Sequence, residues 1–257
     1  MASLSARALH GLPEVRAGDD LAELIFAALD GERLQDGQLV AIAQKVVSKA
    51  ERAVVALADV QPSARAIELA SASPVDGVQP KDPRVVQVVL DQSAEILRAE
   101  RGVLICRTQH GFVCANAGVD ASNAADEDTL IVLPSDPDAS ARRIRARLRE
   151  LIGASVAVLI SDSFGRAWRH GQVDVAIGLA GMQPLEDWRG RTDARGMQLQ
   201  ATWLAIADAA AACADLARAK DSHEPVVIID GLQRYVTDED GPGAVALLRP
   251  LAEDLFR

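Results

Sequence analysis

The segment Ser155-Val156-Ala157-Val158-Leu159-Ile160-Ser161-Asp162-Ser163 joins an apolar run to the polar side chains that follow it at once. An uninterrupted apolar run of this kind is typical of a buried, central β-strand. The strand would deliver a carboxylate and two hydroxyls at its carboxyl end, which is a frequent way to hold a metal ligand rigidly. The segment therefore predicts a central strand that leads into a functional site.

Polar chemistry continues beyond this strand, through a stretch that we call the 160–169 segment. Gly165 permits a tight turn, and Arg166 and Arg169 supply cations suited to phosphate or carboxylate. A further polar run, residues 170–174, follows directly. This density of polar groups favours a ligand site over a plain loop.

Strands and helices are predicted on both sides of this segment, without the regular alternation of a doubly wound sheet. Residues 83–99 have apolar side chains at helical spacing after Pro83, and Ser135 is the expected N-cap of an arginine-rich helix. We predict helices at 20–29, 83–99, 135–151 and 198–219. We predict strands at 39–43, 103–107, 111–115, 129–133, 155–160 and 225–229. The expected fold class is α+β, with residues 1–257 as one module and a surface loop at 70–83.

Composition limits the classes of protein to which the chain can belong. Of its 257 residues, 49% are hydrophobic and 25% charged, as in an ordinary folded globule. The formal net charge of −10 argues against a nucleic-acid binder, because such proteins concentrate lysine and arginine. We find no secretory signal and no apolar run long enough to cross a bilayer, so we expect a cytoplasmic protein without a membrane partner. Cys106, Cys114 and Cys213 show no metal-binding spacing and are expected to be structural thiols.

Two further stretches could carry chemistry. Residues 116–123, the 116–123 segment, alternate short polar and small side chains; Asp120 offers a hard oxygen ligand and Asn123 a hydrogen-bonding amide. An asparagine- and aspartate-rich turn is an equally good interpretation of this composition. Lys45 and Lys49 follow the predicted strand 39–43 and could meet a triphosphate, or could lie at a solvated strand end.

Two carboxylates able to share Mg²⁺ or Mn²⁺, together with several cations, suit phosphoryl transfer. Charge on a transferring phosphoryl group is neutralised by metals and by cationic side chains rather than by covalent chemistry. The P-loop pattern is absent, and no Gly-x-Gly-x-x-Gly follows a strand. A P-loop enzyme and a dinucleotide fold are therefore both disfavoured.

Several motifs, taken in order, closely resemble the coenzyme F420:L-glutamate ligase family over nearly the whole chain. They are Leu12-Pro13-Glu14, Gln44-Lys45-Val46-Val47-Ser48-Lys49, Lys81-Asp82-Pro83-Arg84, His110-Gly111-Phe112-Val113-Cys114-Ala115-Asn116-Ala117-Gly118-Val119-Asp120, Ser161-Asp162-Ser163-Phe164-Gly165-Arg166, Gly171-Gln172-Val173-Asp174-Val175-Ala176-Ile177-Gly178 and Arg249-Pro250. The resemblance implies GTP-dependent ligation of L-glutamate to coenzyme F420-0 through an acyl phosphate, with release of GDP and phosphate. It also implies a two-lobed α+β unit in an intertwined homodimer; we expect no fused flavin-binding domain.

The resemblance also implies roles for individual residues. Leu12, Pro13, Glu14 and Val15 would line the GTP site, and Gln44, Lys49 and Asn123 would contact the nucleotide. Asp120, Asp162 and Ser163 would hold Mg²⁺ or Mn²⁺, with two ions expected and K⁺ as a further candidate. From position alone, Arg166 or Arg169 would hold the acceptor or glutamate.

Two positions depart from the family pattern, and two rival functions stay open. Ala219 stands before Lys220 where the family often has glycine, and Gln109 stands where many members have histidine. The motifs specify nucleotide and metal better than they specify the acceptor, so an amide ligase for a different acid is one alternative. A non-catalytic nucleotide-binding protein is the other.

Overall fold

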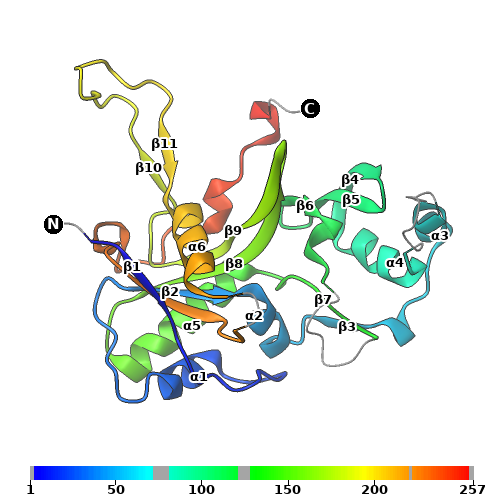
Figure 1. Ribbon diagram of the computed structural model, residues 1–257, viewed down its shortest axis with the longest axis horizontal. Coiled ribbons are helices and arrows are strands. Elements are labelled where there is room, and N and C mark those ends of the chain that lie inside the picture. Colours follow the sequence, from blue (N-terminus) through cyan, green and yellow to red (C-terminus); the bar gives the residue numbers. More distant parts are fainter. Residues whose placement is uncertain (1–2, 72–80, 121–127, 220–221, 255–257) are drawn as a thin grey trace.

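The computed structural model describes residues 3–71, 81–120, 128–219 and 222–254, and a five-stranded mixed sheet forms its centre (Figure 1). The strand order is β1-β12-β2-β8-β9, in which β2 and β8 run parallel and every other pair is antiparallel. The strands are β1 Ser5–Ala8, β12 Val226–Asp230, β2 Leu39–Ala43, β8 Ala157–Arg166 and β9 Arg169–Ala180. The predicted α+β class is confirmed.

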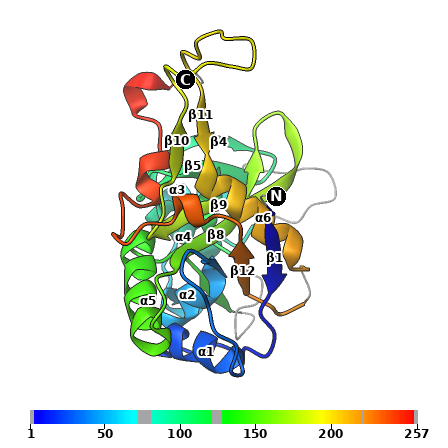
Figure 2. The same ribbon diagram turned by 90° about the vertical axis from the view of Figure 1, so that its left-hand side faces the viewer.

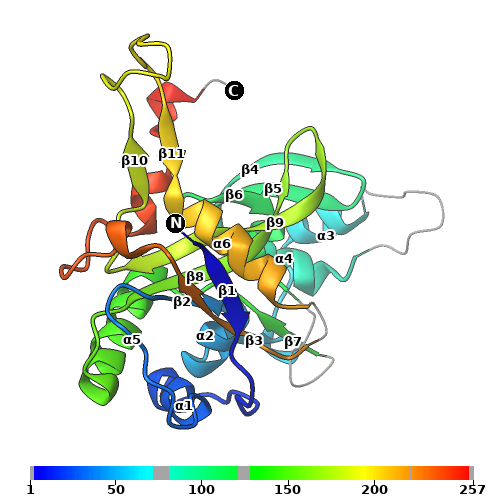
Figure 3. The same ribbon diagram turned by 60° about the vertical axis from the view of Figure 1, so that its left-hand side comes forward.

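Helices cover both faces of this sheet, as Figures 2 and 3 show. Successive side chains of a strand point to opposite faces, so Val40 and Ile42 pack with α1 Leu21–Ala28 and α5 Pro137–Ile152. Leu39 and Ala41 belong to the opposite core, under α6 Ile206–Ala217. These strand residues are fully buried, which explains why the strands appear in the sequence as continuous apolar runs.

The 160–169 segment is not a loop at the end of a strand. Strand β8 continues past Ile160 to Arg166, and β9 returns antiparallel to it from Arg169. The pairing shifts by one residue between Ile160 and Ser161, so that Ile177 is an extra residue on β9. The predicted strand is therefore correct in place but too short, because its polar half pairs with a partner that the apolar pattern does not show.

The described residues between Val54 and Ile131 form a second lobe beside the sheet, at the right of Figure 1. A three-stranded antiparallel sheet, β4-β5-β6, carries its core together with two helices. The two chain crossings between the lobes, β3 and β7, pair with each other. The elements are β3 Val54–Ala56, α3 Ala64–Ser71, α4 Pro83–Asp91, β4 Ser93–Glu100, β5 Val103–Thr108, β6 Val113–Ala115 and β7 Thr129–Ile131. The predicted loop at 70–83 falls largely outside the described residues.

Two predicted helices are wrong in extent. The helix predicted at 83–99 ends at Asp91, and the rest of the range is β4, which pairs with β5. The tight turn at Arg101 and Gly102, both with positive φ, brings the two strands together, so strand pairing outweighs helical spacing. The helix predicted at 198–219 begins only at Ile206, because Trp203–Ala205 is β11, paired with β10 Leu185–Asp187.

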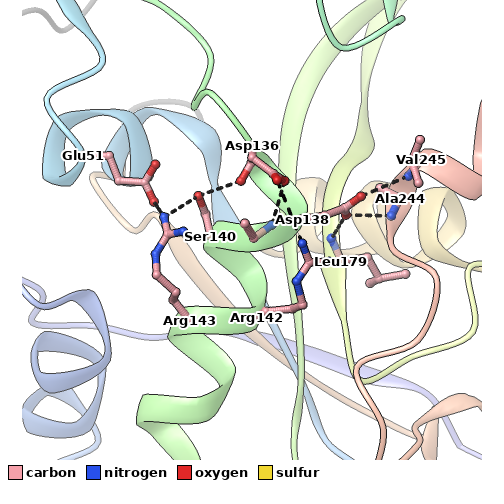
Figure 4. Close-up of polar contacts among 10 residues, drawn as sticks. Glu51, Asp136, Asp138, Ser140, Arg142, Arg143, Leu179, Ala244 and Val245 are labelled. Atoms are coloured by element: carbon pink, nitrogen blue, oxygen red, sulfur yellow. Dashed lines mark hydrogen bonds and ion pairs between the residues drawn. The ribbon is translucent and has the colours of Figure 1, made fainter.

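Helix α5 is anchored by carboxylates in its first turn (Figure 4). Asp136, not the predicted Ser135, is the N-cap and accepts from the backbone N–H of Ala139. Asp138 accepts from the backbone N–H of Leu179 on β9 and of Ala244, at 2.8 and 2.7 Å. One side chain thus joins the helix, the central sheet and the segment that follows β12.

A two-stranded arm extends away from the body of the molecule (Figure 3). It consists of β10, β11 and the residues between them, 188–202. Arg189 stacks on Trp203 and Arg191 on Trp188. Trp203 and Met197 are exposed on it.

No helix among the described residues is long and apolar enough to span a membrane.

Candidate functional site

A pocket of about 690 Å³ opens between α2 Gln44–Ala50, the β8–β9 hairpin and the segments that precede α1 and β12. Its volume is within the range of pockets for small ligands and cofactors. The lining residues are Leu12, Pro13, Glu14, Val15, Ala43, Gln44, Lys45, Val46, Lys49, Ser161, Asp162, Ser163, Asp174, Arg218, Ala219, His223, Glu224 and Pro225. Four stretches far apart in the sequence therefore meet at one site.

The lysines of the pocket lie on a helix, not at a solvated strand end. Lys49 Nζ lies 2.5 Å from Glu14 Oε1, which ties α2 to the segment expected to line the GTP site. Gln44 is buried, and its amide donates to Ser48 Oγ and to the carbonyl of Val132. Gln44 therefore contributes to the wall of the pocket and also to the junction between the lobes.

The 116–123 segment and the 160–169 segment approach each other through Lys45. Asp120 comes from the second lobe, where its backbone pairs with Ile131, and its carboxylate lies 2.8 Å from Lys45 Nζ on α2. The pKa of the Asp162 carboxyl is raised to about 6, chiefly by burial. The charges of Asp174 and Asp120 contribute to this rise, and the hydrogen bond from the Ser163 backbone and the charge of Lys45 oppose it. Asp162 is thus a carboxyl whose ionised form a nearby cation would stabilise.

Three of the predicted site residues that the structure describes do not line this pocket: Asp120, Arg166 and Arg169. Arg166 and Arg169 are exposed at the turn between β8 and β9, and Arg166 Nη2 donates to the carbonyl of His170. Neither arginine lines the pocket. Asn123 lies outside the described residues.

Asp174 and Arg218 line the pocket but were not predicted as site residues. Asp174 on β9 is 1% exposed and pairs with Arg218, which caps the end of α6. Their contact depends on the register of β9 against β8 and on where α6 ends. Alternation along β9 could have indicated that Asp174 points inward, but no sequence signal identifies Arg218 as its partner. His223 is exposed at the pocket rim.

The oxygen donors of the pocket suit a hard divalent cation. Asp162 and Ser163 are adjacent on β8, and the substrate's phosphates often complete the coordination of Mg²⁺. Within the described ranges, no group of three histidine, cysteine or acidic side chains has a geometry that would hold a metal ion. Asp162 and Ser163 in the pocket, and Asp120 beside Lys45, are oxygen donors of the kind that Mg²⁺ and Mn²⁺ accept.

A larger open hollow, about 1020 Å³, lies between α5 and residues 238–242. Its deepest side chain, Arg145, already donates to Asp240 and to the carbonyls of Val156 and Thr237. The hollow contains none of the predicted site residues, so the smaller pocket is the candidate site.

Fold and pocket together define a two-lobed α+β protein whose candidate site combines lysines on α2 with carboxylates on the β8–β9 hairpin. The sequence matches the family model described as F420-0:Gamma-glutamyl ligase over residues 11–231. The chain belongs to this family.

Full-length relatives support this membership. The chain is 42% identical over 257 residues to the coenzyme F420:L-glutamate ligase of Methanothermobacter thermautotrophicus, with 99% of each chain covered. It is 44% identical over 246 residues to that of Methanopyrus kandleri, covering 95% of this chain and 94% of the relative. It is 41% identical over 249 residues to that of Methanocaldococcus jannaschii, covering 96% and 94%.

Proposed function

We propose that this protein is a GTP-dependent ligase that adds L-glutamate to coenzyme F420-0. The observation that carries the proposal is the meeting, in one pocket, of residues that the family motifs assign to nucleotide and metal. They are Leu12, Pro13, Glu14, Val15, Gln44, Lys49, Asp162 and Ser163. These residues come from three separate stretches of the chain, so their convergence is not a consequence of sequence proximity.

The reaction would proceed in two displacement steps. The acceptor carboxylate attacks the γ-phosphorus of GTP, and the bond from that phosphorus to GDP breaks, which gives an acyl phosphate. The amine of glutamate then attacks the acyl carbon, phosphate leaves with the bonding electrons, and the nitrogen gives up a proton as the amide forms. Activation of the carboxylate is needed because its oxygen is otherwise a poor leaving group.

Residues of the chain would hold the reactants for these steps. Lys49 and Lys45 supply positive charge on one wall of the pocket, where the phosphates would lie. Asp162, Ser163 and Asp120 would hold Mg²⁺ or Mn²⁺, which offsets phosphate charge and aligns the γ-phosphoryl group. Holding the reactants in this alignment is the main contribution that a protein makes to phosphoryl transfer.

Incubation of the protein with GTP, Mn²⁺, L-glutamate and coenzyme F420-0 tests the proposal. The expected result is a product heavier by one glutamyl residue and an equal amount of GDP. GTP binding without this product would favour a ligase for a different carboxylic acid. Neither binding nor product would favour a non-catalytic protein with another ligand.

The place of the acceptor or glutamate can be tested separately. Arg166 and Arg169 lie at the exposed turn of the hairpin and are the cations proposed to hold one of these substrates. Arg166→Ala should raise the KM for coenzyme F420-0 or for glutamate and leave the KM for GTP unchanged. An unchanged kcat with unchanged KM values for both substrates would remove Arg166 from the site.

We also propose that the protein forms a homodimer. The arm of residues 185–205 supports this, because it extends from the body and exposes Trp203, Leu204 and Met197. Exposed apolar side chains gathered on one element are typical of interaction sites. Light scattering should give twice the 27.2 kDa chain mass, and Trp203→Ser should shift the value toward one chain.

A further inference from the structure

A buried ion pair lies in the wall of the pocket and has no role in the proposed reaction. Asp174 Oδ2 accepts from Arg218 Nη2, and the two side chains are 1% and 11% exposed. Arg218 Nη1 also donates to the carbonyl of Pro225, at 3.3 Å. Burying an ion pair is costly unless further hydrogen bonds satisfy both groups, so this pair needs an explanation beyond stability.

The same carboxylate accepts hydrogen bonds from two serine hydroxyls of the pocket. Ser163 Oγ donates to Asp174 Oδ1 at 2.6 Å, and Ser161 Oγ donates to Asp174 Oδ2 at 2.7 Å. Arg218 Nη2 in turn donates to Ser161 Oγ at 3.1 Å. Both oxygens of Asp174 are therefore surrounded by donors on the pocket side.

This arrangement decides what the hydroxyl of Ser163 can do toward a ligand. A hydroxyl has one hydrogen to donate and two lone pairs that accept, whereas an ionised carboxylate only accepts. Because the hydrogen of Ser163 is directed to Asp174, its oxygen can meet a pocket ligand only as an acceptor. A cation is bound by the lone pairs of such an oxygen. A phosphate oxygen would instead need a hydrogen from the hydroxyl, and that hydrogen is already donated to Asp174.

The register shift in the β8–β9 hairpin, a β-bulge, sets the contact between Ser163 and Asp174. Ser163 pairs with Asp174 only because the register shifts between Ile160 and Ser161; with the register of the first half of the hairpin, Ser163 would face Val175 instead. The backbone irregularity and the buried carboxylate thus act on the same hydroxyl.

We propose that Asp174 and Arg218 are positioning residues of this site. Their ion pair holds the hydrogen of Ser163 Oγ away from the pocket, so that this oxygen is presented to a divalent cation. The proposal rests on the proposed function, since it takes the ligand of Ser163 to be a metal ion. It concerns the orientation of a ligand by its hydrogen-bond partner, an effect that usually changes metal affinity about 10–100-fold.

The test is a titration of the full-length protein with Mn²⁺, in which free Mn²⁺ is followed by electron paramagnetic resonance. Asp174→Asn preserves the shape of the side chain but replaces one acceptor by a donor. It should weaken Mn²⁺ binding about 10–100-fold and leave the affinity for GTP, measured in EDTA, unchanged. Asp91→Asn, at an exposed position on α4, removes the same charge and should bind Mn²⁺ as the unaltered protein does.

A double-substitution cycle separates positioning from a direct role. If Asp174 acts through Ser163, the pair Asp174→Asn and Ser163→Ala should bind Mn²⁺ no more weakly than Ser163→Ala alone. If the two single losses of Mn²⁺ affinity multiply in the double variant, the proposal is overturned. Unchanged Mn²⁺ affinity in Asp174→Asn would also overturn it.

Arg218 provides a second route if Asp174→Asn does not fold. Arg218→Lys keeps the positive side chain beside Asp174 and should retain most of the Mn²⁺ affinity, whereas Arg218→Gln should lose it. Equal Mn²⁺ affinities of these two variants would overturn the proposal. If the unaltered protein binds no Mn²⁺, the proposal is wrong, and the product assay decides separately whether the ligase function stands. If Mn²⁺ binding is intact and no product forms, the proposed function fails while the positioning role is still measured.

Discussion

At the scale of the residue, Asp162 links the chemistry of the pocket to the stability of the fold. Its carboxyl has a pKa raised from 3.8 to about 6, first by burial and then by Asp174 and Asp120. The unfolded chain releases this proton near the ordinary value, whereas the folded protein keeps it to about pH 6. Folding stability therefore falls as pH rises from about 4 to about 6, by up to about 3 kcal/mol for full ionisation.

Asp162→Asn should consequently stabilise the metal-free protein above this range and abolish turnover. In EDTA at about pH 8, the free energy of unfolding should rise by about 1–3 kcal/mol, and at about pH 4 it should not rise. Denaturant titration at both pH values measures this, with Asp91→Asn as the exposed control. A gain of equal size at both pH values, or wild-type turnover, would contradict the assignment.

The site residues that the sequence predicts are those that lie within a compact motif. Lys49 lies on the short helix that follows β2, and Asp162 and Ser163 continue an apolar run, so local pattern is enough to single them out. Asp174 and Arg218 are different, because their contact joins β9 to the end of α6 across the sheet. Such a contact depends on strand register, and a bulge that shifts register by one residue is not visible in apolar periodicity.

At the scale of the element, the packing of α5 against β9 depends on the absence of a side chain at Gly178. A Cβ built at this position would lie 2.4 Å from the carbonyl oxygen of Pro137, at the start of α5. Because the obstructing atom belongs to the backbone, the helix would have to move. Gly165, on the other strand of the same hairpin, has no atom within 4 Å of its Cβ position.

Gly178→Ala should therefore destabilise the protein by about 1–3 kcal/mol, as overpacking of a buried contact does. Gly165→Ala should change stability by less than about 0.5 kcal/mol, as a surface substitution does. Denaturation midpoints of the two variants measure the difference. Equal midpoints would mean that α5 can shift at little cost.

Elements were predictable where burial alone sets the pattern, and not where pairing competes with helix formation. The strands around Leu39 and Val226 are apolar without interruption because helices cover both faces of their sheet. Residues 93–100 carry apolar side chains at a spacing compatible with a helix, yet they form β4, an edge strand of the three-stranded sheet. Tertiary pairing overrides local propensity in such short amphipathic stretches.

At the scale of the whole molecule, the two lobes are joined through the wall of the pocket. The chain leaves the first lobe at Ala53 and returns at Val132, whose backbone N–H donates to the carbonyl of Ala53 at 3.0 Å. Ser48 Oγ donates to the carbonyl of Val132 at 2.7 Å, and Gln44 Nε2 donates to the same oxygen at 3.1 Å. Nothing in the composition of residues 50–56 resembles a linker, which is why the lobe boundary could not be placed from sequence.

The final prediction concerns this junction. Ser48→Ala should lower the free energy of unfolding by about 1 kcal/mol, since Gln44 still donates to the Val132 carbonyl. The pair Gln44→Ala and Ser48→Ala removes both side-chain donors to that carbonyl, so its loss should exceed the sum of the two single losses. Ser71→Ala, which removes an exposed hydroxyl bonded within α3, is the matched control and should change stability by less than about 0.5 kcal/mol. Denaturant unfolding of the four variants measures these free energies of unfolding. If the loss in the double variant equals the sum of the two single losses, the lobes are held by contacts other than those to this carbonyl.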